Sequence, residues 1–376
     1  MDFSLTEDQL ALQKRVREFA QDVVAPAAAE HDRTGKFPYE IAKIAWKEGF
    51  LNSHVEKEFG GPERGSLSAC IIAEEISAAC SGIGIALDAN ALAQGPVIIG
   101  GNDDQKKRFL QPMTEKPMFA SYAVTEPDAG SDVSRISTTA TKIDDNTYAI
   151  NGLKWWITGG GVASWYFVLA KTENGATGFI VDADSAGIVR GTKEENLGQH
   201  ASNTVRVEFQ DVKVPVENRL GEEGDGFKIA MKTFDYSRPL VAAAAVGVAR
   251  ACLSHARLYA KKRTCFNKRI ISYQGVSFKL ADMAINLDAA RLLTWRAAWL
   301  YDNGLPSTKE SAMAKAFAAD TGMKTAVEAV QVLGGYGYSM DVPMEKLMRD
   351  AKIFQIYEGT SEIQRTIIVA NLLRER

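Results

Sequence analysis

Cysteine and histidine are scarce in this chain of 376 residues, and neither is arranged for metal binding or disulfide formation. Metal sites and disulfide scaffolds have their ligands or cysteines at recognisable spacings. The four cysteines and four histidines are instead scattered, at Cys70, Cys80, Cys252, Cys265, His31, His54, His200 and His255. We therefore expect neither a metal site nor a disulfide framework.

The chain also lacks a strong charge of either sign. Its formal net charge is −3, with 46% hydrophobic and 24% charged residues, so nothing in the composition favours nucleic acid. No apolar run reaches the roughly 18 residues that span a bilayer, and residues 1–4 open neither a signal peptide nor a transit sequence. We expect no membrane span, and a location in the cytoplasm of a bacterium or, for a processed eukaryotic protein, in the mitochondrial matrix.

The length indicates two or three packed regions, and the first, residues 1–118, has a helical pattern. Thr6 and Gln9 can form a capping box before apolar residues at helical spacing. We expect Pro26 to disturb this first helix. Further helices are predicted at residues 39–49, 66–79 and 103–110.

The second region, residues 119–226, consists of short β-prone runs separated by turn signals such as Asn174-Gly175. The expected strands include residues 148–150, 165–170, 179–181 and 205–209. No helical pattern of the length needed for a βαβ crossover lies between them, so we expect antiparallel strands and no Rossmann domain.

The third region, residues 227–376, returns to long helical stretches at 241–251, 278–301 and 311–333. Helices of this length predict an antiparallel bundle. The predicted fold class is therefore mainly α with a central β-domain (α+β): an N-terminal helical domain, a middle antiparallel β-domain and a C-terminal helical bundle.

Glu358 is the candidate catalytic residue, because it places a carboxylate at a break between two helical patterns. Gly359 allows unusual backbone geometry there, and Thr360 can cap the following helix. A carboxylate at such a junction can point inward without interrupting a buried helix face. The alternative is an exposed Glu at an ordinary helix-to-helix turn.

Five other stretches have residues suited to ligand binding, and each also has a structural interpretation. The hydroxyl-rich loop at 122–132 can bind a polar ligand or simply connect two domains. The pair Trp155-Trp156 before three glycines suits a planar ring or an aromatic core. The glycines at 331–337 can admit a phosphate or adenine, or end a helix. Arg238 and Arg263 suit phosphate, although charged runs are usually solvated.

Taken together, these stretches resemble the acyl-CoA dehydrogenase family over essentially the whole chain. The family-like strings are Tyr122 to Ser131, Trp156-Ile157-Thr158, Asp235 to Pro239, Arg263 with Phe266, Gln331 to Gly337, Met348 to Lys352, and Tyr357 to Glu362. The resemblance implies a C-terminal four-helix bundle, FAD in a groove, and a homotetramer built as a dimer of dimers.

The resemblance also implies roles for particular residues. FAD is expected to contact Tyr122, Val124, Thr125, Gly130, Ser131, Trp156, Ile157 and Thr158, with Thr360 and Glu362 completing the site. A neighbouring subunit would surround the ADP part with Arg263, Phe266, Gln274, Gln331, Leu333, Gly334 and Gly335. The acyl-CoA substrate would meet Ser131, Asp235, Arg238, Tyr357 and Gly359.

The implied reaction is α,β-dehydrogenation of a fatty acyl-CoA to the trans-2-enoyl-CoA. Glu358 would remove the pro-R α-proton while the β-hydride passes to flavin N5, and electrons would go on to electron-transferring flavoprotein. Residues 88–101, 227–231 and 234–240 look more like the medium-chain branch, which favours a straight chain of medium length over a short one.

Two other functions stay open. One is an acyl-CoA oxidase, although from the length of the chain we expect no counterpart of the extra C-terminal domain of those enzymes, and the other is a catalytically silent acyl-CoA-binding protein. Asp128, Gly159 and Asn267 depart from the usual family pattern. Asp128 adds a negative charge near the expected flavin loop, whereas Asn267 can adopt the same left-handed turn as the usual glycine.

Overall fold

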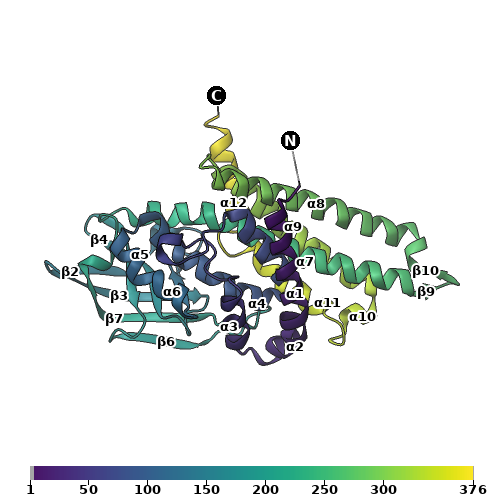
Figure 1. Cartoon of the computed structure of the whole chain (residues 1–376), viewed down its shortest axis with the longest axis horizontal. Helices are drawn as coiled ribbons and strands as arrows, with labels where there is room; N and C mark the ends of the chain where they lie inside the picture. Colours follow the sequence, from purple (N-terminus) through teal and green to yellow (C-terminus); the bar gives the residue numbers. More distant parts are fainter. Residues whose placement is uncertain (1–3, 376) are drawn as a thin grey trace.

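A computed structural model describes residues 4–375, with a β-sheet at one end of an elongated molecule and long helices extending to the other (Figure 1). The eight-stranded sheet lies at the left of Figure 1, while α8 (Gln274–Asp302), the end of α7 (Gly226–Lys262) and the hairpin of β9 (Thr264–Cys265) and β10 (Lys268–Arg269) reach the right. The N-terminal helices pack between these two parts. The predicted fold class, mainly α with a central β-domain, is confirmed.

The N-terminal region begins with the predicted capping box, in which Thr6 and Gln9 cap each other's backbone N–H. The helix is irregular before Pro26, where a π-helical turn separates α1 from α2, but it is not broken, because Pro26 occupies the first turn of α2. The elements are α1 (Glu7–Phe19), the π turn Ala20–Val24, α2 (Ala25–Thr34), α3 (Tyr39–Lys47), the 3₁₀ turn Lys57–Phe59, α4 (Ser66–Gly100), α5 (Asp103–Phe109) and α6 (Gln111–Glu115).

Helix α4 is longer than predicted. It has one non-helical residue, Cys80 (φ −161°, ψ 111°), and then continues to Gly100. Gly82 and Gly84 allow close packing beyond this point: a Cβ on Gly82 would lie 3.2 Å from the Gln199 Cα, and one on Gly84 would lie 2.6 Å from the Ser77 Oγ. The second half of α4 forms one wall of the site described below.

The middle region forms one eight-stranded sheet with the order β6-β7-β3-β2-β4-β5-β8, to which β1 is added beside β4. The expectation of antiparallel strands is wrong for two pairs: β1 runs parallel to β4 and pairs Ala120 with Trp165, and β2 is parallel to β4 where Thr139 pairs with Lys171. The β2–β3 hairpin lies between β1 and β4 in sequence and serves as the crossover, so no helix is needed. The strands are β1 (Ala120–Ala123), β2 (Thr139–Asp144), β3 (Thr147–Ile157), β4 (Trp165–Thr172), β5 (Gly175–Asp182), β6 (Ile188–Lys193), β7 (Val205–Pro215) and β8 (Arg219–Leu220), with 3₁₀ turns at Val133–Arg135 and Val216–Asn218.

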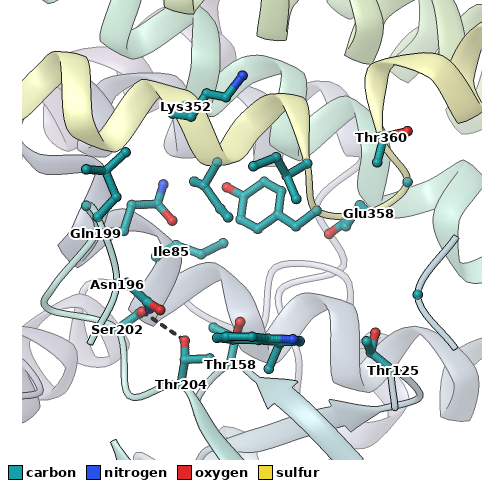
Figure 2. Close-up of a pocket in the computed structure, with 18 of the residues that line it drawn as sticks. Ile85, Thr125, Thr158, Asn196, Gln199, Ser202, Thr204, Lys352, Glu358 and Thr360 are labelled. Carbon is teal, nitrogen blue, oxygen red and sulfur yellow. Dashed lines mark hydrogen bonds between the residues drawn. The ribbon is translucent and has the colours of Figure 1, made fainter. Parts of the chain in front are cut away.

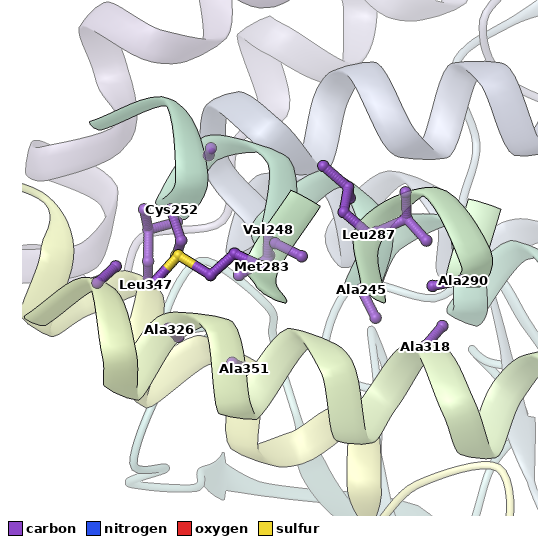
Figure 3. Packing of buried hydrophobic residues seen from close by; sticks show 14 of the residues in the cluster. Ala245, Val248, Cys252, Met283, Leu287, Ala290, Ala318, Ala326, Leu347 and Ala351 are labelled. Carbon is purple, nitrogen blue, oxygen red and sulfur yellow. The ribbon is translucent and has the colours of Figure 1, made fainter. Parts of the chain in front are cut away.

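The C-terminal region is the predicted helical bundle, in which α9 (Thr308–Leu333) packs against α7, α8 and α12 (Ser361–Leu372). Its core is rich in alanine: Figure 3 shows Ala245 of α7 near Ala290 of α8 and Ala318 of α9. Small side chains let the helices approach closely and bury a continuous apolar interface. The remaining elements are β9 (Thr264–Cys265), β10 (Lys268–Arg269), the 3₁₀ turn Ile270–Ser272, α10 (Gly335–Tyr338), α11 (Met344–Ala351) and the 3₁₀ turn Lys352–Gln355.

Pro239 lies inside α7 without an unpaired carbonyl, because α9 replaces the missing hydrogen bond. A proline has no N–H to donate to the carbonyl four residues earlier, which here belongs to Asp235. The Ser311 hydroxyl donates to this carbonyl at 3.0 Å, and the Thr308 hydroxyl donates to the Asp235 carboxylate at 2.6 Å. These bonds fix the segment of α7 that borders the site.

Two helices, α4 and α7, are long and apolar enough to cross a membrane by length and composition alone. In the folded chain, 83% and 72% of the residues in their most apolar windows are buried. The two helices pack against each other, so their apolar surface already forms protein core.

Candidate active site

Two adjoining cavities meet at Glu358. The larger, of about 540 Å³, lies between the β-domain and the segment from α11 to α12, and the smaller, of about 310 Å³, extends between α4 and α7. The predicted residues that line both are Thr125, Gly130, Ser131, Trp156, Thr158, Tyr357, Glu358 and Gly359. Thr360 lines only the larger cavity, whereas Tyr122, Val124 and Arg238 line only the smaller one.

The larger cavity has two facing walls (Figure 2). Thr125, Thr158 and Thr204 lie on the β-domain side, while Lys352, Glu358 and Thr360 come from the C-terminal segment. The hydroxyls of Ser202 and Thr204 are 3.2 Å apart on the β-domain wall. Hydroxyl groups on one wall and a carboxylate on the other suit a flat polar ligand lying between them.

Glu358 occupies a strained turn. Its φ is +52° and that of Gly359 is +88°, so two successive residues are left-handed. This conformation is uncommon for a residue other than glycine and is often found at functional sites. The carboxylate accepts a hydrogen bond of 2.6 Å from the Ser237 hydroxyl, and Thr360 caps α12 as predicted. The side chain thus faces the cavities, which disfavours the alternative of an exposed Glu at an ordinary turn.

Burial raises the pKa of Glu358 above its ordinary value, while the Ser237 hydrogen bond and the Arg238 and Lys315 cations oppose that rise. A second carboxyl, Asp88 of α4, lines the smaller cavity. Burial, together with the negative charge of Glu358, raises the pKa of Asp88 to about 7. The acid–base behaviour of this cavity therefore depends on a group of neighbouring charges.

Lys154 of β3 fixes the loop at 122–131 by hydrogen bonds to two of its residues. Its fully buried ammonium donates to the Glu126 carboxylate at 2.8 Å, the Val124 carbonyl at 3.1 Å and the Leu169 carbonyl at 2.7 Å. Burial lowers the pKa of Lys154 to about 8 although Glu126 opposes this change. Our sequence analysis did not identify Lys154. The alternation Tyr148, Ile150, Gly152, Lys154 would have placed it on the inner face of its strand.

The residues around the larger cavity fit the isoalloxazine of FAD. Trp156 has a left-handed backbone (φ +60°), and 56% of its surface is exposed although it lines both cavities. A bulky residue in this conformation is strained, and here it presents an open aromatic surface beside the Thr125 and Thr158 hydroxyls. Asp128 is exposed and does not line either cavity.

Some predicted residues lie away from these cavities in this chain. Ile157 is 1% exposed and packs in the sheet core. Asp235 lies beside Arg238, with 3.6 Å between their charged atoms, and Glu362 is exposed in the first turn of α12. None of the three is in contact with either cavity.

The residues predicted for the ADP part gather elsewhere. Arg263, Leu333, Gly334 and Gly335 line a third cavity of about 590 Å³ that shares no residue with the first two. Phe266, three residues after Arg263 in the sequence, is 86% exposed, and Gln274 and Gln331 are exposed as well. Asn267 has the predicted left-handed conformation, with φ +63°. Within one chain, therefore, the cavity formed by these residues is separate from the two cavities that Glu358 lines.

Several lining residues were not anticipated from the sequence. They come from the loop between β6 and β7 and from the C-terminal 3₁₀ turn: Asn196, Leu197, Gly198, Gln199, Ser202, Thr204, Lys352, Ile353 and Ile356. The loop is fixed because the Gln199 N–H donates to the Asp350 carboxylate at 2.5 Å. This contact joins segments far apart in sequence, and no local pattern indicates it.

Family models for the acyl-CoA dehydrogenase N-terminal, middle and C-terminal domains match residues 6–117, 121–212 and 224–373. The chain belongs to the acyl-CoA dehydrogenase family. This match confirms the predicted enzyme class, an FAD-dependent acyl-CoA dehydrogenase.

Similar proteins cover the chain almost completely. The "Probable medium-chain specific acyl-CoA dehydrogenase 2, mitochondrial" of Caenorhabditis briggsae is 43% identical over 99% of this chain and 92% of its own. The structure of butyryl-CoA dehydrogenase from Megasphaera elsdenii is 42% identical, with TM-score 0.97 over 100% of both chains. A chain in a structure described as the electron transferring flavoprotein of Acidaminococcus fermentans is 40% identical, with TM-score 0.97 over 100% of both chains.

Proposed function

We propose that this enzyme converts a straight-chain fatty acyl-CoA, first of all one of medium length, to the trans-2-enoyl-CoA, with Glu358 removing the α-proton. One observation carries the proposal: the Glu358 carboxylate lies in a strained turn where a hydroxyl-lined cavity meets an apolar one. A thioester crossing this junction would present its α-carbon to the carboxylate. When bound in the larger cavity, FAD supplies the acceptor for the β-hydride at its N5 atom.

The base must overcome a large difference in acidity. A free Glu has a pKa near 4.3 and the α-carbon of a thioester is far less acidic, and each unit of this gap corresponds to about 1.4 kcal/mol. Burial already raises the pKa of Glu358, and a bound acyl chain would exclude more water and raise it further. The site therefore strengthens the base on substrate binding.

The thioester oxygen needs a hydrogen-bond donor, because negative charge develops on it as the proton leaves. The backbone N–H of Glu358 has no acceptor within residues 4–375. We propose that it donates to this oxygen. The base and part of the oxyanion site would then belong to one residue.

The smaller cavity suits the acyl chain. Its apolar lining comes from α4 and α7 and includes Leu92, Met231, Phe234, Leu240 and Val241. Among the proposed substrate residues, Arg238, Tyr357 and Gly359 also line it, and Ser131 lies at its junction with the larger cavity. A short acyl chain is the second candidate, since one side chain in such a pocket changes selectivity by only about 1 to 3 kcal/mol.

The visible spectrum tests this proposal. We expect the purified protein to be yellow and its flavin band to bleach when acyl-CoA is added without oxygen. A panel of acyl-CoAs from C4 to C16 should give the highest kcat/KM at medium length. A colourless protein that neither takes up FAD nor bleaches would support the silent acyl-CoA-binding alternative. A highest kcat/KM at C4 would indicate a short-chain substrate in place of a medium-chain one.

We propose electron-transferring flavoprotein as the electron acceptor. The similar chain from the Acidaminococcus fermentans structure supports it. Turnover with this acceptor should exceed turnover with oxygen, and hydrogen peroxide measured during turnover should stay far below the product formed. Stoichiometric peroxide would indicate an acyl-CoA oxidase instead.

We also propose a homotetramer, a dimer of dimers in which the third cavity of one subunit completes the FAD site of its neighbour. The exposed Phe266 and Tyr336 beside Arg263 support such an interface. Light scattering would show a monomeric mass if this proposal is wrong. For location, the cytoplasm of a bacterium or the mitochondrial matrix remains our proposal.

A further inference from the structure

Side-chain donors from three helices converge on the two carbonyls of the Glu358–Gly359 turn. The Lys315 ammonium of α9 donates to the Gly359 carbonyl at 2.6 Å. The Gln364 amide of α12 donates to the Glu358 carbonyl at 3.0 Å and to the Gly359 carbonyl at 2.9 Å. The Arg238 guanidinium of α7 approaches the Glu358 carbonyl at 3.5 Å.

Lys315 is an unusual member of this group because it is fully buried. Its ammonium has no carboxylate within 4.0 Å among residues 4–375, and the Gly359 carbonyl is its hydrogen-bond partner. An unpaired buried cation is costly, so it is rarely found without a specific role. The charge that attracts it most strongly is that of Glu358.

We infer that Lys315 is a positioning residue, whose buried ammonium, together with Gln364, fixes the left-handed turn that directs the Glu358 side chain into the cavities. Positive φ is unfavourable at Glu358, although not at Gly359, and hydrogen bonds to the carbonyls of both residues offset that cost. This inference rests on the proposed role of Glu358 as the base. Lys315 itself does not line either cavity.

The charge of Lys315 also acts on Glu358. Burial lowers the pKa of Lys315 to about 8, against the attraction of Glu358, so the cation is present at neutral pH. A nearby positive charge favours the carboxylate, and its removal should raise the pKa of Glu358. The other charged or titratable groups around the pair are Arg238 and Asp235 of α7, Asp320 of α9, Glu362 of α12, Asp88 of α4, Tyr122 of β1 and Tyr357.

Two variants separate the hydrogen bond from the charge. Lys315→Met removes both, whereas Gln364→Met removes neutral donors to the same carbonyls and leaves every charge in place. We expect both proteins to retain FAD and to show flavin reduction by acyl-CoA slowed about 10- to 100-fold, as for a misaligned reacting group. Only Lys315→Met should also move the rising limb of the pH–rate profile to higher pH. Asp88 is present in both variants, so a difference between their pH–rate profiles reports the loss of the Lys315 charge.

A crystal structure of Lys315→Met gives a measurement independent of activity. We expect Glu358 to leave the left-handed region or its side chain to turn away from the cavities. An unchanged turn, or flavin reduction with the rate and pH profile of the unsubstituted enzyme, would overturn the inference. Should Lys315→Met not fold, a wild-type rate in Gln364→Met would overturn it as well. If the unsubstituted enzyme does not bleach, the proposed function fails, while the crystal structure still decides the role of Lys315 in the turn.

Discussion

Replacing Glu358 with Gln is expected to leave FAD bound and to slow flavin reduction by acyl-CoA roughly 10²- to 10⁴-fold, the contribution of a general base. Gln has nearly the same shape and can keep the Ser237 contact at 2.6 Å, but it cannot accept the α-proton. The measurement is anaerobic stopped-flow bleaching of the flavin band, with the FAD-to-protein ratio recorded on the same sample.

A matched control is Glu40→Gln, on the surface of α3. The Glu40 side chain is 80% exposed and lines neither cavity, so its loss of charge should change the bleaching rate little. Bleaching of the Glu358→Gln protein at the wild-type rate would remove Glu358 from the role of base. A Glu358→Gln protein without FAD would instead indicate that the residue supports cofactor binding.

The second large effect is expected at Lys154. Lys154→Met leaves the buried Glu126 carboxylate without its cation, a change that costs roughly 3 to 5 kcal/mol in buried ion pairs. The same ammonium holds the Val124 carbonyl, so the loop at 122–131 should loosen and FAD should be released more readily. Thermal unfolding and the FAD-to-protein ratio after dialysis measure the two consequences.

Two further variants test whether the effect of Lys154→Met comes from the buried ion pair. Lys142→Met removes a Lys whose side chain is 48% exposed beside Asp145, and such surface pairs contribute only about 0 to 1 kcal/mol. The double variant Glu126→Gln with Lys154→Met removes the uncompensated charge and should recover part of the lost stability. A Lys154→Met protein that melts and retains FAD like the unsubstituted enzyme would show that the buried pair has no such role.

Local patterns in the sequence determined most of the secondary structure. The capping box at Thr6, the strands around Trp165 and Phe179, and the helix start at Thr360 depend on neighbours a few residues away. The break at Glu358 and Gly359 was readable for the same reason, since it interrupts two regular periodicities. The candidate roles of individual site residues came from the family resemblance, because residue type alone left each stretch with two interpretations.

Tertiary structure decided what local patterns could not express. The parallel pairing of β1 with β4 depends on an edge of β4 that is free to pair. The continuation of α4 past Cys80 goes with close packing at Gly82 and Gly84. The buried cations decide the electrostatics of the site, yet Lys154 and Lys315 lie far in sequence from the loops they hold. Hydrogen bonds across such separations exist only once the chain is folded, and the same folding supplies the burial and the nearby charges that change the pKa of Lys154 and Lys315.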